Sequence, residues 1–329
     1  MEYRQLGKTG IQVSTIALGC WPFAGGVVWG EQDDDVSIAT VHTALEAGIN
    51  FFDTAEGYEH GHSERVLGRG LIGRRKDAVI ASKVSANHLR PEDVFAACEQ
   101  SLRNLQTDYL DLYQIHWPNH DVPLVDTIDA LARLQEQGKV RAIGVSNFGV
   151  GDLSDLVDLT ACASDQLPYS LLWRAIEREI RPLCEAHEVG IICYSPLAQG
   201  LLAGRYASAD EVPDGLSRTR LYSSSRPLAE HGEPGCESEV FEGLTTIRAI
   251  ATEVGEPMAS VALAWVRQQR CVTSVLVGAR SPEEVHLNQP AFELTLAPAV
   301  SEALSAATEA VKAKLGNNPD PWMSKSRYR

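Results

Sequence analysis

Short apolar runs alternate along the chain with segments in which apolar residues recur at helical spacing. Eight of these runs are continuous in large apolar residues, which is typical of strands covered on both faces. The predicted strands are 14–20, 49–55, 78–84, 110–117, 142–148, 165–170, 190–197 and 274–279. The predicted helices are 36–48, 91–105, 125–139, 151–160, 175–187, 237–255 and 258–269. This alternation predicts parallel strands joined by crossover helices.

Eight such units predict an α/β fold, a closed (β/α)8 TIM barrel, with residues 1–329 as one domain. A plain barrel takes about 250 residues, so the rest of the chain predicts three additions. The first is an N-terminal β-hairpin that turns at residues 7–10 and plugs the bottom of the barrel. The second is a long loop, 203–236, in the seventh unit, and the third is a C-terminal helix, 298–315, with a tail after it.

Composition narrows the class of partner and the cellular compartment. A net charge of −15 argues against nucleic acid or an anionic membrane as a partner. No apolar run approaches the roughly 20 residues of a membrane span, and the N-terminal stretch lacks the apolar centre of a signal peptide. The seven cysteines are scattered without a C-x-x-C pair, which indicates free thiols and predicts a cytoplasmic protein. The oligomeric state does not follow from the sequence.

Polar residues stand where the predicted strands end, which in a barrel is the edge that carries active sites. The stretch FFDTAEGYEHGHSE, 51–64, contains Asp53 and Tyr58, and Lys83 and His116 end the third and fourth strands. A single strand-end Lys or His is more often an ion-pair or loop-anchoring residue. Together the four place a carboxylate, a phenol, an ammonium and an imidazole around one mouth.

This combination suits proton transfer to a carbonyl. Tyr has an ordinary pKa of about 10, and a nearby cation favours the phenolate. We therefore expect Lys83 to lower the pKa of Tyr58, and Asp53 to keep Lys83 charged and oriented. His116 would hydrogen-bond the substrate oxygen, while Tyr58 acts as general acid in reduction and as general base in the reverse direction.

Four other motifs have plainer explanations. The histidines of 60–62 and 116–121 lack a cysteine partner and the helical spacing of a zinc site, so no metal is expected. The glycines of 68–73 follow a helical pattern and precede a strand, the reverse of a dinucleotide fingerprint. Ser63 is expected to cap the next helix, with Glu64 in its first turn.

The four strand-end residues and their settings, "FFDTAEGY", "ASKV", "QIHWP" and "GVSNF", resemble the Asp–Tyr–Lys–His tetrad of the aldo-keto reductases. The resemblance runs from "YRQLGKTGIQVSTIALG" to "VLVGARSPEEVHLNQ" and is strongest to the bacterial branch that includes general-stress, inositol-operon and potassium-channel-β-subunit-like proteins. It implies a barrel that reduces aldehydes or ketones, or oxidises alcohols, with NADP(H) and less often NAD(H). It also allows a slow-turnover, redox-sensing regulatory protein of the channel-subunit type.

The resemblance also implies which residues bind the cofactor. Ser146, Asn147 and Gln166 would hold the nicotinamide carboxamide. Tyr194, which alone could be a core aromatic, would stack on the nicotinamide ring. The pyrophosphate and adenosine contacts would come from Ser195, Leu197, Gly200, Arg205, Arg218, Gly278, Arg280, Glu284 and Asn288. Arg280 and Arg218 favour NADP(H) because arginine suits a phosphate. Glu284 stands where the family commonly has glutamine and could repel that phosphate, so NAD(H) stays possible.

Several residues after the strand ends are predicted to line a substrate pocket. They are Trp21, Glu59, His60 and Trp117. Trp322 in the tail is expected to fold over the opening. Aromatic walls suit an apolar face or a sugar ring, and this mixture does not choose between sugars, aromatic aldehydes, ketoacids and polyols.

Overall fold

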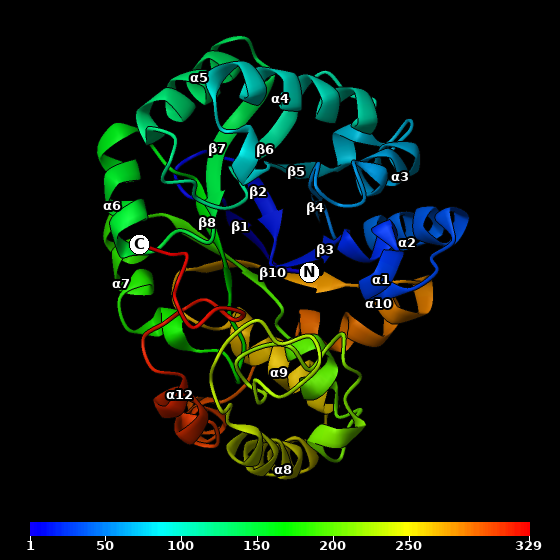
Figure 1. Cartoon of the computed structure of the whole chain (residues 1–329). Coiled ribbons are helices and arrows are strands. Elements are labelled where there is room, and N and C mark those ends of the chain that lie inside the picture. The colour runs from blue at the N-terminus through cyan, green and yellow to red at the C-terminus, as the bar shows by residue number, and fades with distance from the viewer.

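Eight parallel strands form a closed barrel in this computed structural model, which describes residues 1–329 except the side chains of residues 27 and 28. The strands are β3 (Ile16–Gly19), β4 (Phe51–Asp53), β5 (Val79–Val84), β6 (Leu110–Ile115), β7 (Val140–Ser146), β8 (Ser164–Pro168), β9 (Gly190–Tyr194) and β10 (Val272–Gly278). Their order around the barrel is β10-β3-β4-β5-β6-β7-β8-β9 (Figure 1). The eight predicted strands and the TIM-barrel fold are confirmed.

An N-terminal hairpin closes the bottom of the barrel. It pairs β1 (Tyr3–Gln5) with β2 (Gln12–Ser14) in antiparallel register. Leu6 in its turn is fully buried among inward-facing residues of the strands. Gly7 has φ of 49°, and a Cβ there would lie 2.4 Å from the carbonyl oxygen of Ala163, so the turn can approach the barrel only with glycine. The predicted hairpin and its plugging role are confirmed.

Helices surround the barrel on its outer face (Figure 1). They are α1 (Gly26–Trp29), α2 (Asp34–Glu46), α3 (His62–Gly70), α4 (Pro91–Leu105), α5 (Leu124–Glu136), α6 (Val150–Leu159), α7 (Ile180–His187), α8 (Glu237–Val254), α9 (Met258–Arg267), α10 (Pro282–Asn288), α11 (Pro298–Ala306) and α12 (Glu309–Leu315). Helix α2 is capped by Asp33, whose carboxylate accepts the N–H groups of Asp35 and Val36. No helix among the described residues is long and apolar enough to cross a membrane.

The predicted helix 298–315 is wrong in one respect, because it is broken into α11 and α12. At the end of α11 the carbonyl of Ser305 accepts the Thr308 N–H at 3.3 Å and also Arg174 Nη1 at 2.7 Å. Thr308 is the N-cap residue of α12. The predicted helix 175–187 is likewise two pieces, a 3-10 turn over Ala175–Glu177 and then α7. The contact of Arg174 at the first break joins segments 131 positions apart in the sequence.

The long loop 203–236 and the C-terminal tail hold each other in place. Arg220, which is buried in the loop, pairs with Glu233 through a 2.9 Å contact. Its guanidinium also donates to three carbonyls at the end of the chain, those of Leu315, Asn318 and Asp320. The tail, drawn in red, then crosses the face of the barrel from α12 to α6 (Figure 1).

Candidate active site

The structure brings the four predicted tetrad residues together at the mouth of the barrel. Asp53 ends β4, Lys83 lies near the end of β5, His116 follows β6, and Tyr58 comes from the loop before α3. Lys83 Nζ lies 2.5 Å from Asp53 Oδ1 and 3.1 Å from the Tyr58 hydroxyl. The rings of Tyr58 and His116 meet edge to face with centroids 5.8 Å apart. One ammonium therefore joins the carboxylate to the phenol, with the imidazole beside it.

Burial sets the charge state of the cation and of the imidazole. Burial lowers the pKa of Lys83, but Asp53 and Tyr58 outweigh it and the pKa is raised, so Lys83 is an ammonium. Burial and the charge of Lys83 lower the pKa of His116 to about 3. His116 is therefore a neutral imidazole at neutral pH and can donate one hydrogen bond to a substrate oxygen.

The expectation that Lys83 lowers the pKa of Tyr58 holds only in part. Burial raises the pKa of Tyr58, Lys83 lowers it, and the negative charge of Asp53 raises it again. The net direction is upward, because loss of water around the phenol outweighs the attraction of the ammonium. Tyr58 is thus a protonated phenol at neutral pH, the state that can give a proton.

Two glutamines lie behind the tetrad inside the barrel. Gln166 Nε2 donates to Asp53 Oδ2 at 2.7 Å, and Gln114 Nε2 donates to the same oxygen at 3.2 Å. Gln114 was not predicted as a site residue from the sequence. The two-residue alternation of side chains along β6 could have indicated it, because Leu112 and Gln114 point to the same inner face of the barrel.

The predicted carboxamide residues are adjacent, but Asn147 is occupied within the protein. Its Nδ2 donates to His116 O and to Ser146 Oγ, each at 3.0 Å. Its Oδ1 accepts the hydroxyls of Tyr194 at 2.8 Å and Tyr328 at 2.6 Å. In this arrangement Asn147 orients Tyr194 and the tail, and it has no hydrogen-bonding position left for a carboxamide.

The tail covers the predicted nicotinamide platform. Trp322 stacks on Tyr194 with ring centroids 6.2 Å apart and an interplanar angle of 9°. It also meets Trp117 edge-on at 6.1 Å, and the guanidinium of Arg327 lies 3.8 Å from the centroid of the Trp117 ring. The predicted position of Trp322 over the opening is confirmed.

The predicted pyrophosphate residues include irregular backbone in the loop after β9 and an arginine, Arg218, in the long loop that follows. Ser195 and Gly200 have positive φ values of 52° and 98°, and Leu197 between them accepts the N–H of Gly200. Arg218 Nε is buried and has no hydrogen-bond partner among the described residues. A buried guanidinium nitrogen without a partner is costly unless a ligand satisfies it, and a phosphate is its natural partner.

The predicted adenosine residues lie on β10, on α10 and, for Arg280, in the short connection between them. Arg280 Nε donates to Gln32 Oε1 at 2.9 Å, a contact that the sequence analysis missed. Glu284 Oε2 accepts the Arg280 N–H at 2.8 Å, and Glu284 Oε1 faces Arg205 at 3.9 Å. The negative charge of Glu284 is therefore partly offset by Arg205. Gly278 ends β10, and Asn288 ends α10 with its amide donating to the Glu284 carbonyl.

Comparison with known proteins identifies the family. The sequence profile of the Aldo/keto reductase family matches residues 15–309. This chain belongs to the aldo/keto reductase family. It is 31% identical over 300 residues to the aldo-keto reductase YhdN of Bacillus subtilis (strain 168), with 87% of each chain covered. The resemblance inferred from the sequence is thus confirmed.

Two further relatives are described with different cofactors, one with NADH and the other with NADPH. The chain is 30% identical over 335 residues to the NADH-specific methylglyoxal reductase of Escherichia coli (strain K12), covering 95% of this chain and 100% of that protein. An aldo-keto reductase from Klebsiella pneumoniae, solved in complex with NADPH, matches with a TM-score of 0.73 at 29% identity. That match covers 100% of this chain and 99% of the other.

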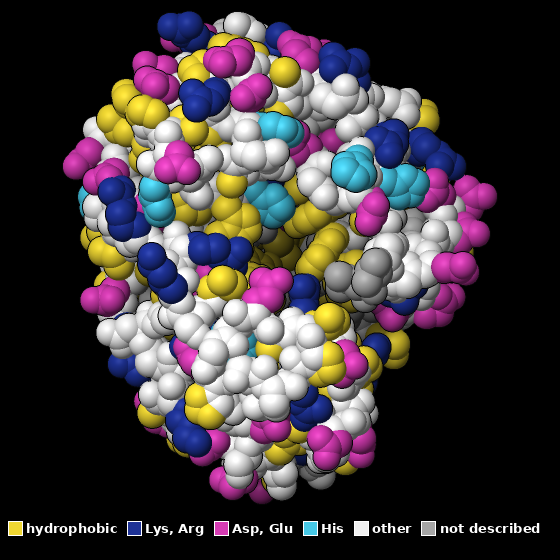
Figure 2. Space-filling view, viewed as in Figure 1, with side chains coloured by type: hydrophobic (Ala, Val, Ile, Leu, Met, Phe, Trp, Pro, Cys, Tyr) yellow, Lys and Arg dark blue, Asp and Glu magenta, His cyan; other side chains and the backbone are white. Residues whose placement is uncertain are grey.

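The mouth of this aldo/keto reductase is walled by aromatic rings. Trp21 stacks on Tyr58 with centroids 5.8 Å apart and meets Trp29 edge-on at 5.4 Å. Figure 2 shows a hollow near the middle of this face with largely hydrophobic walls. Glu59 and His60, in the loop after Tyr58, are exposed, with φ values of 46° and 50°.

The remaining polar residues of 51–64 have structural roles in this aldo/keto reductase. The predicted cap by Ser63 is wrong: Gly61 precedes α3, and Ser63 Oγ donates to the carbonyl of Cys20 at 2.7 Å. Glu64 does lie in the first turn, but it is buried and accepts Ser82 Oγ at 2.6 Å. His62 contacts Asp34 at 2.9 Å. Within the described chain no group of three metal-ligating side chains comes together.

Proposed function

We propose that this aldo/keto reductase transfers hydride between the nicotinamide of NADP(H) and the carbonyl carbon of an aldehyde or ketone, or the matching alcohol in reverse. One observation carries the proposal: Lys83 Nζ contacts both Asp53 and the Tyr58 hydroxyl, beside a neutral His116. Residues 1–329 would act as one domain. Seven free cysteines among the described residues support a reducing, cytoplasmic location.

The chain supplies the proton and the polar surroundings of the reaction. The cofactor, when bound, supplies or accepts the hydride. The neutral imidazole of His116 donates a hydrogen bond to the carbonyl oxygen, and Tyr58 gives that oxygen its hydroxyl proton. The ammonium of Lys83 stabilises the phenolate that results, and Asp53 keeps Lys83 protonated. The aromatic walls exclude water and hold a small substrate against the phenol.

The residues present fit a dinucleotide, and they favour NADP(H). Arg218 offers a buried nitrogen without a partner in the described chain, and Arg280 is fixed by Gln32 near the end of β10. The Klebsiella pneumoniae relative with bound NADPH supports this preference. The NADH-specific relative from Escherichia coli is the reason that NAD(H) is tested beside it. We propose that Arg280 binds the 2′-phosphate of NADP(H), since arginine pairs with phosphate through two parallel N–H groups.

The cofactor assignment is tested with Arg280→Ala. We expect the Kd for NADPH to rise by about tenfold, as one charge-assisted contact is lost, and the Kd for NADH to stay within about twofold. Quenching of protein fluorescence by each cofactor measures both constants. Arg270→Ala, which removes an arginine that is 79% exposed and paired with Glu185, is the matched control. An equal loss of affinity for both cofactors would exclude a role of Arg280 in 2′-phosphate binding.

The reaction is tested by a cofactor-oxidation screen over aldehydes, ketones, sugars and ketoacids, and by the reverse screen over alcohols and polyols. We expect turnover with at least one carbonyl class and faster turnover with NADPH than with NADH. Tight NADP(H) binding without turnover in either direction would contradict the enzyme assignment. That result would favour the redox-sensing regulatory protein instead.

A further inference from the structure

Gln114, on the inner face of β6, is a buried polar residue that has no role in the proton transfer described above. We propose that Gln114 is a positioning residue, which holds Asp53 of the tetrad and Gln166 of the nicotinamide site in one fixed arrangement. This inference rests on the proposed function.

The contacts of Gln114 point in two directions. Its Nε2 donates to Asp53 Oδ2 at 3.2 Å, and its Oε1 faces Gln166 Nε2 at 3.5 Å. Gln166 Nε2 also donates to Asp53 Oδ2 at 2.7 Å. Gln114 lies directly beside Lys83 in the register of β5 and β6, so it touches the same carboxylate from the next strand.

These contacts fix which way the amide of Gln166 faces. Two acceptors, Asp53 Oδ2 and Gln114 Oε1, lie on one side of that amide, so only its nitrogen can point there. Its oxygen is then the atom that can receive an N–H of the nicotinamide carboxamide. Gln114 thereby links the group that binds the cofactor to the group that keeps Lys83 charged.

A purely structural account of Gln114 is weak. The side chain is fully buried inside the barrel. A buried amide is unfavourable unless both of its polar ends find partners, and an apolar residue of similar size would fill the same space without that requirement. Both ends of Gln114 meet groups of the candidate active site and nothing else among the described side chains.

The charge of Asp53 explains how Gln114 would influence proton transfer. Donors on Asp53 Oδ2 disperse the negative charge of the carboxylate. Without Gln114 that charge is more concentrated and opposes ionisation of Tyr58 more strongly, so the pKa of Tyr58 rises further. In the reduction Tyr58 must be protonated, and activity falls as pH rises through its pKa. The alkaline limb of the kcat profile should therefore move to higher pH.

The test is Gln114→Met, which keeps the length of the side chain and removes its amide. We expect kcat for carbonyl reduction to fall about fivefold, as for one lost hydrogen bond, and the alkaline limb to move up by about half a pH unit. KM for the carbonyl should stay within about twofold, because Gln114 does not face the substrate. Gln269→Met removes a glutamine amide that donates only to the Trp265 carbonyl, and it should leave the pH limb in place. A Gln114→Met limb that superimposes on that of the wild type would overturn the proposal.

Two further measurements separate this inference from the proposed function. If Gln114→Met does not fold, Gln114→Leu gives the same loss of the amide in a different shape. If the wild type turns over no carbonyl or alcohol, the proposed function fails and the Kd for NADPH decides the role of Gln114. A freed Gln166 amide should then weaken NADPH binding about threefold in Gln114→Met, and an unchanged Kd would refute the positioning role.

Discussion

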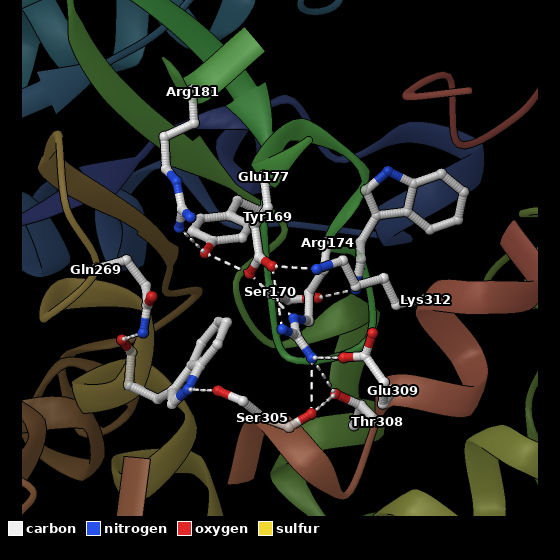
Figure 3. Close-up of polar contacts among 12 residues, drawn as sticks. Tyr169, Ser170, Arg174, Glu177, Arg181, Gln269, Ser305, Thr308, Glu309 and Lys312 are labelled. Atoms are coloured by element: carbon white, nitrogen blue, oxygen red, sulfur yellow. Dashed lines mark hydrogen bonds and ion pairs between the residues drawn. The ribbon is translucent and has the colours of Figure 1, made fainter. Parts of the chain in front are cut away.

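Two buried clusters in this protein combine a cation, a carboxylate and a tyrosine, and they differ in what faces the phenol. In the tetrad the ammonium of Lys83 contacts the Tyr58 hydroxyl at 3.1 Å. In a second group, which we call the anchor cluster, the Tyr169 hydroxyl donates to the carboxylate of Glu177 at 2.8 Å (Figure 3). The anchor cluster comprises Tyr169, Arg174, Glu177, Arg181, Glu309 and Lys312.

The charge beside each phenol decides what that phenol can do. Burial and the negative charge of Glu177 raise the pKa of Tyr169 well above its ordinary value, although Arg181 acts against them. Burial raises the pKa of Tyr58 too, but there the strongest opposing influence is the cation Lys83. A phenol against a carboxylate is held as a donor, whereas a phenol against an ammonium can give up its proton.

The anchor cluster instead fastens the end of the chain to the barrel. Glu177 accepts hydrogen bonds from Arg174 and Lys312, and Arg174 also reaches the Ser305 carbonyl and Glu309 (Figure 3). These contacts join the segment after β8 to α11 and α12. The tail that covers the mouth begins where α12 ends, so the anchor cluster supports the active site from outside it.

The sharpest test of this difference is the pair Tyr58→Phe and Tyr169→Phe. We expect Tyr58→Phe to lower kcat by roughly 10²–10⁴, because a proton donor is lost, with the Kd for NADPH nearly unchanged. Tyr169→Phe should leave kcat nearly unchanged and lower the free energy of unfolding by about 1 kcal/mol. Steady-state kinetics and urea unfolding of both variants make the comparison. Near-full activity in Tyr58→Phe would disprove its role as proton donor.

Breaking the anchor cluster should cost stability rather than chemistry. Arg174→Met leaves the carboxylate of Glu177 with one cation fewer, and we expect the free energy of unfolding to fall by about 2–3 kcal/mol, as for lost hydrogen bonds to a charged group. Urea unfolding at neutral pH measures the loss. The control Arg178→Met removes an exposed arginine of the same segment whose one contact to α12 is long, 3.5 Å to the Lys312 carbonyl, and it should change stability by less than about 0.5 kcal/mol. Similar losses in the two variants would contradict the anchoring role of Arg174.

The anchor cluster also predicts acid sensitivity. Burial raises the pKa of Glu177, but Arg174 and Lys312 outweigh it and lower the pKa from 4.5 to about 2. The stabilisation is therefore present above about pH 4.5 and is lost as pH falls towards about 2. We expect it to account for about 2 kcal/mol of the stability lost between about pH 5 and pH 3. Glu177→Gln should lose correspondingly less stability over that interval, and parallel pH curves for the two proteins would refute this.

Local patterns in the sequence were enough for the strands and for the tetrad. Continuous apolar runs mark strands buried on both faces, and parallel strands end at one edge of the barrel, so Asp53, Lys83 and His116 had to meet there. The hairpin followed from its glycine turn. The family followed from the same strand-end residues and the stretches that surround them.

Other features were decided only by tertiary contacts. Gln114 joins Asp53 across 61 positions, Arg220 holds carbonyls 95 to 100 positions away, and Tyr328 reaches Asn147 across 181. The same holds for the pKa of Tyr58, which burial raised where the sequence predicted a fall. Periodicity reports which face of an element is buried, but not which polar group from a distant segment it meets there. Desolvation and hydrogen bonding depend on which distant groups surround a side chain. The three-dimensional packing therefore decided the contacts of Gln114, Arg220 and Tyr328 and the direction of the pKa shift of Tyr58.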